Sequence, residues 1–552
     1  MREARPERME QTGLYTMKKT SAKRSVLKYA ALMIAMLGIL LCLRLVWSQT
    51  FYTLEAPRPV DGVLDMRGVD LDNSPTFFLN GQWKFYPNQL LTHEDLQAGD
   101  KPFRTLEVPG DWGEALNPDS GTSYGYGTYR LRILIDPLKR PVALWIKNIQ
   151  TSSAVEINGV SEGDIGKPAS SAGEYTPRNI SYTASYTVAG TTELDVLIRA
   201  ANYDEPFNGG IMRSIRFGSQ ASIDSVRWFS IGSQLVTIMI LLLHGLYAFI
   251  LYLFNRQERA LSTMSLLTLS VGLALLSGQD NLLQVLLPVS YTWLIKIRLI
   301  SLLWQNLFMI KLFRRLSSAP PRNAWLSAYT ALLVCLTGVL VAAPASWAHA
   351  FVDFYGFIGV YLIPYVWLFY IVGTMIVKNR NDKDVAFLLL TAAGIISNLT
   401  WSVFESTIDV TTVYYPIDLM VTMIGFAAYW FKKYFRQANE NSSLNRQLKK
   451  ADKLKDQFLA NTSHELRTPL HGIMNIAQNV VSKERAKLDQ GSLKDMELLI
   501  TISRRMSHML GDLLDVARLQ EHRIALRQEP LQVQALVPGV IGMLHFMIQG
   551  KA

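Results

Sequence analysis

The sequence predicts a multidomain membrane protein with an extracellular all-β sandwich, a seven-helix transmembrane bundle, and a cytoplasmic coiled coil leading into an antiparallel helical hairpin. Three observations support this prediction. Of the 552 residues, 49% are hydrophobic and only 18% are charged, which is unlike a single soluble domain. Residues 50–226 alternate in short polar and apolar steps, and residues 228–435 contain long apolar runs. Charged, amphipathic segments follow from residue 436.

The N-terminal segment is predicted to anchor the chain in the membrane. Residues 1–25 are polar and basic, and residues 26–47 form an apolar run, which is the pattern of a signal anchor. No small-x-small cleavage pattern follows Trp47, so retention of this helix is favoured over cleavage. The basic flank is expected to stay in the cytoplasm and the chain after residue 50 to be exported, with Arg44 snorkelling to the membrane surface.

Residues 50–226 are predicted to form an all-β domain, because short alternating segments are broken by Gly, Pro, Asn and Asp. Asn80-Gly81 and Asn158-Gly159 are hairpin-turn dipeptides with strand-like flanks. A β-sandwich is the expected architecture. The clearest strands are Tyr129–Ile135, Val142–Lys147 and Glu193–Arg199.

Four stretches of this domain resemble the galactose-binding-like jelly-roll modules of glycosidases: Leu79–Phe85, Val108–Trp112, Gly127–Arg130 and Glu156–Gly159. The resemblance implies a jelly-roll sandwich that binds an extracellular small ligand, for which a carbohydrate is one candidate. No paired carboxylates occur at a recognisable spacing, so binding is expected rather than glycoside hydrolysis.

The candidate ligand residues are aromatic, amide and carboxylate side chains in loop-like positions, which are the types that sugar sites commonly combine. They are Trp112, Tyr124, Tyr126, Asn202, Tyr203 and Asp204. The alternative for each of them is a structural role in the core or in a turn.

Residues 228–435 are predicted to form a seven-transmembrane domain. The apolar runs are Trp228–Phe254, Leu261–Leu276, Leu294–Ile310, Trp325–Ala342, Val352–Val377, Val385–Phe404 and Leu419–Phe431. Lys and Arg gather in alternate loops, whereas the loops at 277–292, 343–351 and 405–416 contain neither. This asymmetry places the β-domain outside and the C-terminal segment in the cytoplasm. Lys296 and Arg298 are exceptions that either snorkel or face the bundle interior.

An exported β-domain followed by seven spans and a cytoplasmic helical segment is similar to the seven-transmembrane receptors with diverse intracellular signalling modules. The resemblance rests on architecture and implies signal reception by a protein in contact with membrane lipid. A transporter or a structural bundle is the alternative, but no internal repeat or midplane charge pair is apparent.

The segment after the last span is predicted to be helical and dimeric. Residues 436–457 form a coiled-coil linker, because apolar residues recur every three or four positions between charged ones. Residues 453–523 form a hairpin of two amphipathic helices, and Leu493–Leu519 is the second helix. Two hairpins in a homodimer would make a four-helix bundle.

His464 lies on the helix face opposite the apolar stripe of the first hairpin helix. Thr468 is one turn further on and Glu465 is the next residue. Histidine is largely neutral at cytoplasmic pH, so its ring nitrogen is available as a nucleophile. Pro469 lacks an amide proton and should bend or loosen the helix.

The stretch Ser463–Leu470 resembles the phosphoacceptor box of bacterial sensor histidine kinases. The resemblance implies that His464 is phosphorylated, that Glu465 is the general base, and that Thr468 positions water for dephosphorylation of a partner. It implies ATP with Mg²⁺ as the phosphate source, a response-regulator receiver domain as partner, and a bacterial cell membrane as location. The stretch Leu510–Asp515 also resembles the second helix of this domain. His471 is a rival on the same helix that lacks the box.

Residues 524–552 resemble the start of the ATP-binding domain that follows in this family, but no nucleotide-binding box is present. The chain is therefore expected to be truncated, with its ATP site in a missing C-terminal domain. The alternative is a catalytically dead receptor or phosphotransfer partner that depends on another chain.

Cys42 and Cys335 both lie in apolar runs, so neither a disulfide framework nor a cysteine metal site is expected. No motif for reading nucleic acid occurs.

Overall fold

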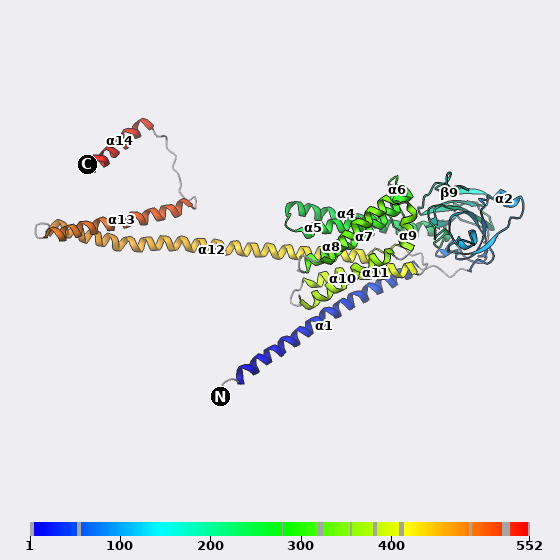
Figure 1. Ribbon diagram of the computed structural model, residues 1–552, viewed down its shortest axis with the longest axis horizontal. Coiled ribbons are helices and arrows are strands. Elements are labelled where there is room, and N and C mark those ends of the chain that lie inside the picture. Colours follow the sequence, from blue (N-terminus) through cyan, green and yellow to red (C-terminus); the bar gives the residue numbers. More distant parts are fainter. Residues whose placement is uncertain are drawn as a thin grey trace. The chain divides into compact units, whose positions relative to one another are not determined.

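The computed structural model describes residues 5–51, 57–278, 280–317, 324–353, 356–378, 384–407, 413–484, 488–520, 530 and 532–549. The chain divides into two compact units, Met1–Lys433 and Tyr434–Ala552. Within the first unit, the strands gather at one end of the helices, and the short helices α6 (Leu282–Leu286) and α9 (Ala345–Asp353) lie at that end (Figure 1).

Two antiparallel sheets make up most of the β-domain. The first has the order β4 (Arg104–Val108), β3 (Gly81–Pro87), β5 (Gly125–Leu134), β11 (Glu193–Asn202), β8 (Ser152–Ile157) and β9 (Val160–Ile165), with β1 (Val63–Asp65) parallel to β5. The second has the order β10 (Tyr182–Tyr186), β6 (Val142–Ile146), β13 (Arg216–Ser219) and β2 (Phe77–Phe78). The strands β7 (Ile149–Gln150) and β12 (Gly210–Ile211) form a small third pair. Two short helices, α2 (His93–Gln97) and α3 (Gly113–Leu116), lie between strands.

The two large sheets share one apolar core, which confirms the predicted sandwich. Trp83 and Tyr129 from the first sheet and Leu144 and Phe217 from the second belong to the same buried cluster. The burial of β5 alternates along most of its length, as expected for a strand with one face on a core. The three strands predicted from the sequence correspond to β5, β6 and β11.

The two Asn-Gly dipeptides have different roles. Asn158 and Gly159 have φ of 50° and 80° and connect the paired strands β8 and β9, as the turn chemistry predicts. Asn80-Gly81 instead links β2 of the second sheet to β3 of the first. A Cβ at Gly81 would lie 2.8 Å from Cδ of Pro59. This close approach of two chain segments, rather than a hairpin, requires glycine there.

The second sheet is covered on its outer face by α4 (Gln220–Phe254), so both faces of β6 are buried. Ala143 and Trp145 pack against Ile223 of α4. Ser219 ends β13 and caps α4, because its hydroxyl accepts a hydrogen bond from the amide of Ser222 at 3.3 Å. The β-domain therefore continues into the helical bundle without a loop.

Seven helices among the described residues are long and apolar enough to cross a membrane. They are Val26–Thr50 within α1 (Arg5–Thr50), α4, α5 (Arg259–Leu276), α7 (Tyr291–Leu316), α8 (Ala324–Ala342), Gly356–Val377 within α10 (Gly356–Lys378), and Val385–Phe404 within α11 (Val385–Thr407). The predicted anchor and six of the seven predicted runs are in this set. The last predicted run, Leu419–Phe431, is short and begins the long helix α12 (Ile417–Glu484).

The beginning of α12 is nevertheless part of the bundle. Met423 and Phe426 are buried in the same cluster as Leu389 of α11. A Cβ at Gly425 would lie 2.9 Å from the amide nitrogen of Thr391, so α11 and α12 approach closely through small residues.

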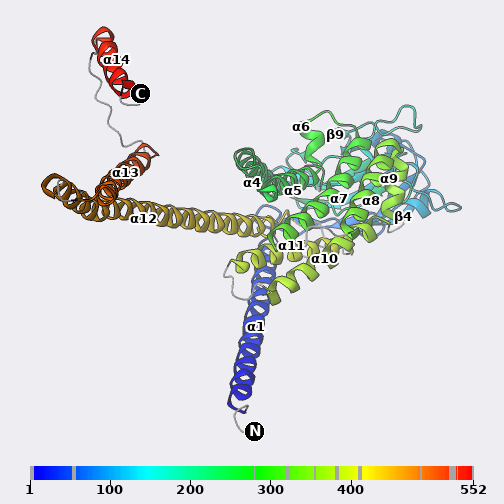
Figure 2. The same cartoon turned by 60° about the vertical axis from the view of Figure 1, so that its left-hand side comes forward.

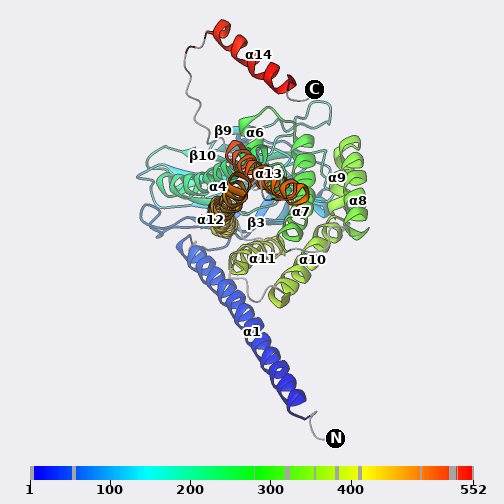
Figure 3. The same cartoon turned by 90° about the vertical axis from the view of Figure 1, so that its left-hand side faces the viewer.

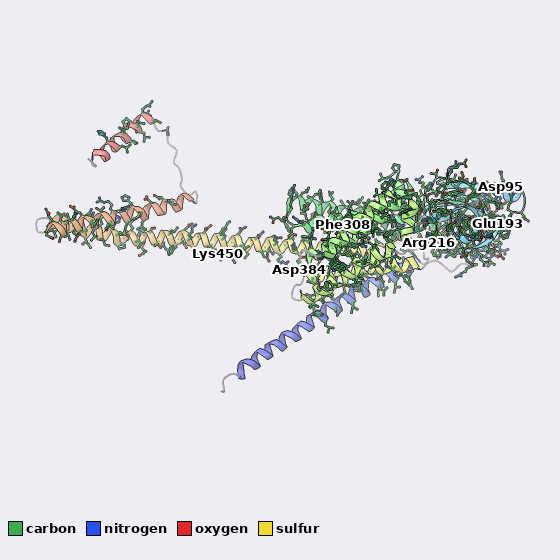
Figure 4. The ribbon with its side chains drawn as sticks, in the orientation of Figure 1. Asp95, Glu193, Arg216, Phe308, Asp384 and Lys450 are labelled. Atoms are coloured by element: carbon green, nitrogen blue, oxygen red, sulfur yellow. The ribbon has the colours of Figure 1, made fainter. Side chains whose placement is uncertain are left out.

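Ion pairs hold this part of α12 at both ends. Asp418 pairs with Arg44 of α1 at 2.7 Å. Lys432 pairs with Asp384 at 2.9 Å, just before α11, and Lys433 pairs with Glu258 at 3.0 Å, just before α5. The helix from Asp418 to Lys433 rises about 23 Å. It therefore runs from the end of the bundle near the β-domain to the opposite end, which is marked by Asp384 in Figure 4.

The other helices pack around this arrangement. Helix α1 runs beside α11 and α10 (Figure 2), and α8 lies at the edge of the bundle beside α7 (Figure 3). Lys296 of α7 faces the bundle interior, because its Nζ donates to the carbonyls of Val341 and Ala343 at 3.0 and 2.6 Å. These carbonyls end α8, where a cation is favourable.

The second unit contains the rest of α12, α13 (Gln490–Gln520) and α14 (Val533–Gln549). Helix α13 confirms the predicted second hairpin helix. The carboxylate of Asp489 caps its start by accepting a hydrogen bond from the amide of Ser492 at 3.2 Å. The apolar residues of the predicted linker on α12, Leu444, Leu448, Leu454 and Phe458, are exposed in this single chain. Lys450 on the same segment projects from the helix (Figure 4). Within residues 524–552, which resemble the start of an ATP-binding domain, the structure describes the helix α14.

Candidate functional site

The hairpin of α12 and α13 is held by apolar side chains from both helices. A groove of about 390 Å³ lies between them. It is lined by Leu466, Pro469, Leu470, Ile473, Met506, Met509 and Leu510. Leu466 and Ile473 remain 47% and 44% exposed, so this chain alone covers only part of the apolar stripe predicted for the first helix.

His464 lies on the exposed side of α12, next to the groove but facing away from it. The preceding residue, Ser463, is 2% exposed, whereas His464, Glu465 and Thr468 are all exposed. Because successive helical residues are rotated by about 100°, burial of Ser463 directs the imidazole to solvent. An exposed imidazole can attack an incoming phosphorus atom through the lone pair of a ring nitrogen.

Thr468 and Pro469 modify the helix next to this histidine. The hydroxyl of Thr468 donates to the carbonyl of His464 at 3.2 Å, which leaves its oxygen able to accept a hydrogen bond from water. Pro469 lies inside α12, which continues through it to Glu484. Pro469 has no amide proton for the carbonyl of Glu465. The structure therefore brings the three predicted catalytic residues together within one helical turn.

Two of the predicted ligand residues lie in the β-domain core. Trp112 is fully buried, stacks on Tyr129 with a centroid separation of 5.9 Å, and donates its indole N–H to the carbonyl of Ser123 at 2.9 Å. Asn202 is also fully buried, and its amide donates to the carbonyls of Ser123 and Glu205 at 2.9 and 2.7 Å. Both side chains donate hydrogen bonds to loop carbonyls, so they have the structural role that was the alternative to ligand contact.

The other four predicted ligand residues, Tyr124, Tyr126, Tyr203 and Asp204, are half-buried. Asp204 accepts a hydrogen bond from the hydroxyl of Tyr175 at 3.0 Å. Burial raises the pKa of the Asp204 carboxyl above its usual range, although the hydrogen bond from Tyr175 opposes this effect. Ligand binding by these four residues stays a prediction.

Sequence reasoning missed a polar cavity of about 340 Å³ where the β-domain meets the bundle. Glu205 follows β11, Tyr291 begins α7 and His349 belongs to α9, and all three line this cavity. They are far apart in the sequence and share no motif, so no local signal could have grouped them.

Comparisons with known proteins agree with the geometry of the hairpin. The His Kinase A (phospho-acceptor) domain family matches residues 454–522. The chain is 37% identical over 117 residues to hybrid signal transduction histidine kinase D of Dictyostelium discoideum, covering 21% of this chain and 7% of that protein. It is 28% identical over 104 residues to the aerobic respiration control sensor protein ArcB homolog of Haemophilus influenzae, covering 19% and 31%. The chain thus spans less than a third of the length of these relatives.

Solved structures resemble the chain only loosely. A GH2 β-galacturonidase from Eisenbergiella tayi has a TM-score of 0.19 and 16% identity, covering 26% of this chain and 24% of that one. A β-glucuronidase from Ruminococcus gnavus has a TM-score of 0.22 and 13% identity, covering 30% of each chain. Likeness at this level is no evidence of a shared activity.

The exposed histidine, its helical hairpin and the family match define residues 454–522 as a histidine-kinase phospho-acceptor domain. The chain is a membrane protein related to the sensor histidine kinases, with an antiparallel β-sandwich near its N-terminus.

Proposed function

We propose that this chain is the receptor and phospho-acceptor part of a sensor histidine kinase in a two-component system. His464 receives phosphate from ATP with Mg²⁺, held by an ATP-binding domain, and passes it to an aspartate of a response-regulator receiver domain. The observation that carries the proposal is the exposed His464, one turn before Thr468, on a helix that continues from the membrane bundle.

The roles of the neighbouring residues follow from their chemistry. Glu465 is exposed beside His464, so its carboxylate can hold the second imidazole proton and compensate the charge that develops during attack. Thr468 has a hydroxyl oxygen free to orient water. It contributes to the reverse reaction, in which the regulator loses its phosphate.

The proposed topology places the β-domain outside a bacterial cell membrane and the phospho-acceptor domain in the cytoplasm. The distribution of Lys and Arg among the loops supports this orientation. The crossing of the bundle by α12 between Asp418 and Lys433 supports it as well. The β-domain then receives an extracellular small ligand, for which a carbohydrate is one candidate.

The active form is proposed to be a homodimer through the hairpin. The apolar groove between α12 and α13 leaves Leu466, Ile473 and Met506 nearly half exposed. A second hairpin would bury these side chains and complete a four-helix bundle.

Phosphorylation in trans tests the proposal. The chain is incubated in membranes with radiolabelled ATP and a separately purified histidine-kinase ATP-binding domain. Label that is lost in acid is expected on the wild type and on His471→Gln, because His471 is exposed on the same helix without the flanking box. No label is expected on His464→Gln. Equal labelling of both variants, or none on the wild type, would refute the proposal.

A further inference from the structure

The cavity between the β-domain and the bundle has the features of a built polar site. Gln150 of β7 donates to the hydroxyl of Tyr291 at 3.1 Å, and Asn179 donates to Gln150 at 2.6 Å. The side chains of Glu205 and His349 pair with one another across the junction. These contacts tie the β-domain to α7 and α9 around the cavity, whose volume is about 340 Å³.

Two buried polar atoms of this cavity have no hydrogen-bond partner among the described residues. They are Oε1 of Glu205 and Nε2 of His349, and the two residues are only 3% and 7% exposed. Leaving a buried polar atom unpaired costs free energy. Because both residues line the cavity, a bound polar molecule could satisfy both atoms.

The charge of the lining is predominantly positive. The lining residues include three cations, Lys147, Arg213 and Arg298, and one carboxylate, that of Glu205. Arg298 lies within the span of α7, and no ion pair of its guanidinium is present among the described residues. Arg213 lines the same cavity and adds a second guanidinium to it. A cation within a span usually has a functional role, and paired guanidiniums match a carboxylate well.

We propose that this cavity binds a small, hydroxyl-rich carboxylate, with its acid group at Arg298 and Arg213 and its hydroxyls at Glu205, His349 and the amides. The excess of positive charge selects an anion, and the amide and unpaired atoms select hydroxyl groups. The inference rests on the proposed receptor function and names the ligand class. It places the ligand at the junction, whereas the sequence had suggested a site formed by Trp112, Tyr124, Tyr126, Asn202, Tyr203 and Asp204.

The position of Arg298 also provides a path to α12. A second cavity of about 260 Å³ shares Gly278, Arg298 and Leu302 with the first. It extends to Leu419 and Thr422 of α12. A ligand that draws Arg298 toward the junction changes the lining of the second cavity, to which Leu419 and Thr422 of α12 also belong. Ligand binding and the position of α12 are therefore coupled.

Binding to the purified chain in phosphatidylcholine nanodiscs tests the inference, with D-gluconate as the probe. D-glucose tests the need for the carboxylate, and acetate tests the need for the hydroxyls. Gluconate is expected to raise the thermal unfolding midpoint more than either control. Arg298→Gln is expected to weaken gluconate binding at least about tenfold, because a charge-assisted hydrogen bond is lost. Arg140→Gln, on an exposed loop of the β-domain, should bind as the wild type does.

Several results would overturn the inference. Gluconate could fail to bind at millimolar concentration, or could bind Arg298→Gln and wild type equally. If Arg298→Gln does not fold, Glu205→Gln and Arg213→Gln supply the same comparison. Stabilisation of the wild type by phosphatidylglycerol nanodiscs but not by gluconate would assign the cavity to a lipid headgroup instead. The readout is independent of His464: loss of labelling at His464 with gluconate binding intact would refute only the proposed kinase function.

Discussion

Asp418, in the first turn of α12, forms a buried ion pair with Arg44 near the end of α1, with 2.7 Å between Oδ2 and the guanidinium nitrogen. The Ser397 hydroxyl donates to the same carboxylate at 3.1 Å. The guanidinium also lies over the ring of Tyr415, 4.1 Å from its centroid. The helix that leads to His464 is therefore fastened to the N-terminal anchor. Arg44 was expected to snorkel to the membrane surface, but it is buried because Asp418 supplies a counter-charge inside the bundle.

Breaking this pair should destabilise the bundle. Asp418→Asn leaves the buried Arg44 without its counter-charge, and we expect a loss of about 3–5 kcal/mol in unfolding free energy. The double variant Arg44→Met with Asp418→Leu should recover much of that loss, because neither charge then remains buried. Thermal unfolding in detergent measures both effects.

The exposed pair Lys455–Asp452 provides the control. Its atoms are 3.5 Å apart and both side chains are more than half exposed. Asp452→Asn should cost at most about 1 kcal/mol. A loss for Asp418→Asn no larger than this would contradict the structural importance of the buried pair.

Asp204 should make the stability of the β-domain depend on pH. Its pKa is raised by burial in the folded state, so the folded protein holds this proton more tightly than the unfolded chain. Both states are protonated well below pH 4, and the folded state loses stability as pH rises from there through the raised pKa. Asp204→Asn should therefore raise the unfolding midpoint at pH 7, with a gain that disappears toward pH 4. The exposed Asp119→Asn should show no such trend, and a pH-independent gain for Asp204→Asn would argue against burial as the cause.

Thr468→Ala should separate the two proposed reactions of the phospho-acceptor domain. The hydroxyl can orient water but takes no part in attack on ATP, so phosphorylation of His464 should stay within about twofold of wild type. Dephosphorylation of the regulator should fall at least about tenfold. Thr501→Ala is the matched control. Thr501 makes the same type of hydrogen bond on α13, from its hydroxyl to the carbonyl of Glu497 at 2.8 Å. An equal decrease of both reactions in Thr468→Ala would show that the hydroxyl acts only through the helix.

The linker on α12 should transmit the signal according to its helical phase. The apolar stripe of Leu444, Leu448, Leu454 and Phe458 is 61–67% exposed in the single chain, as expected for a coiled coil awaiting a second copy. Deleting residues 444–450 removes one heptad and rotates the following helix by only about 20°. Ligand-dependent phosphorylation should therefore be largely retained. Deleting 444–446 or 444–447 shifts the seam in opposite senses and should fix the output high or low, whereas equal tolerance of all three deletions would indicate a flexible tether.

Much of the architecture was predictable from the sequence because its causes are local. Apolar runs mark spans wherever they occur. The alternation in β5 and β11 and the amphipathic period of α13 are properties of neighbouring residues. The proposal of His464 as phospho-acceptor also rests on local sequence, since Glu465 and Thr468 accompany it within about one helical turn.

Residue type alone could not assign the side chains of the β-domain. Trp112 and Asn202 are chemically suited to a sugar, yet the packing of Trp112 on Tyr129 and the loop carbonyls around Asn202 place both in the core. Aromatic and amide side chains serve equally well in a core and in a binding site, so only their burial distinguishes the two.

The sequence by itself determined the β-rich region, most of the membrane spans and the helical C-terminal region, and it marked His464 as the candidate phospho-acceptor, because each of these signals is encoded within a few consecutive turns or strands. Only the tertiary structure decided that Asp418 meets Arg44, 374 positions away, and that Glu205, Arg298 and His349 surround one cavity. Such groupings depend on how the β-domain and the helices pack against one another. Charges and polar atoms that are distant in the sequence become neighbours only when the folded chain buries them together and excludes water. No periodicity or short motif shows which of them will meet.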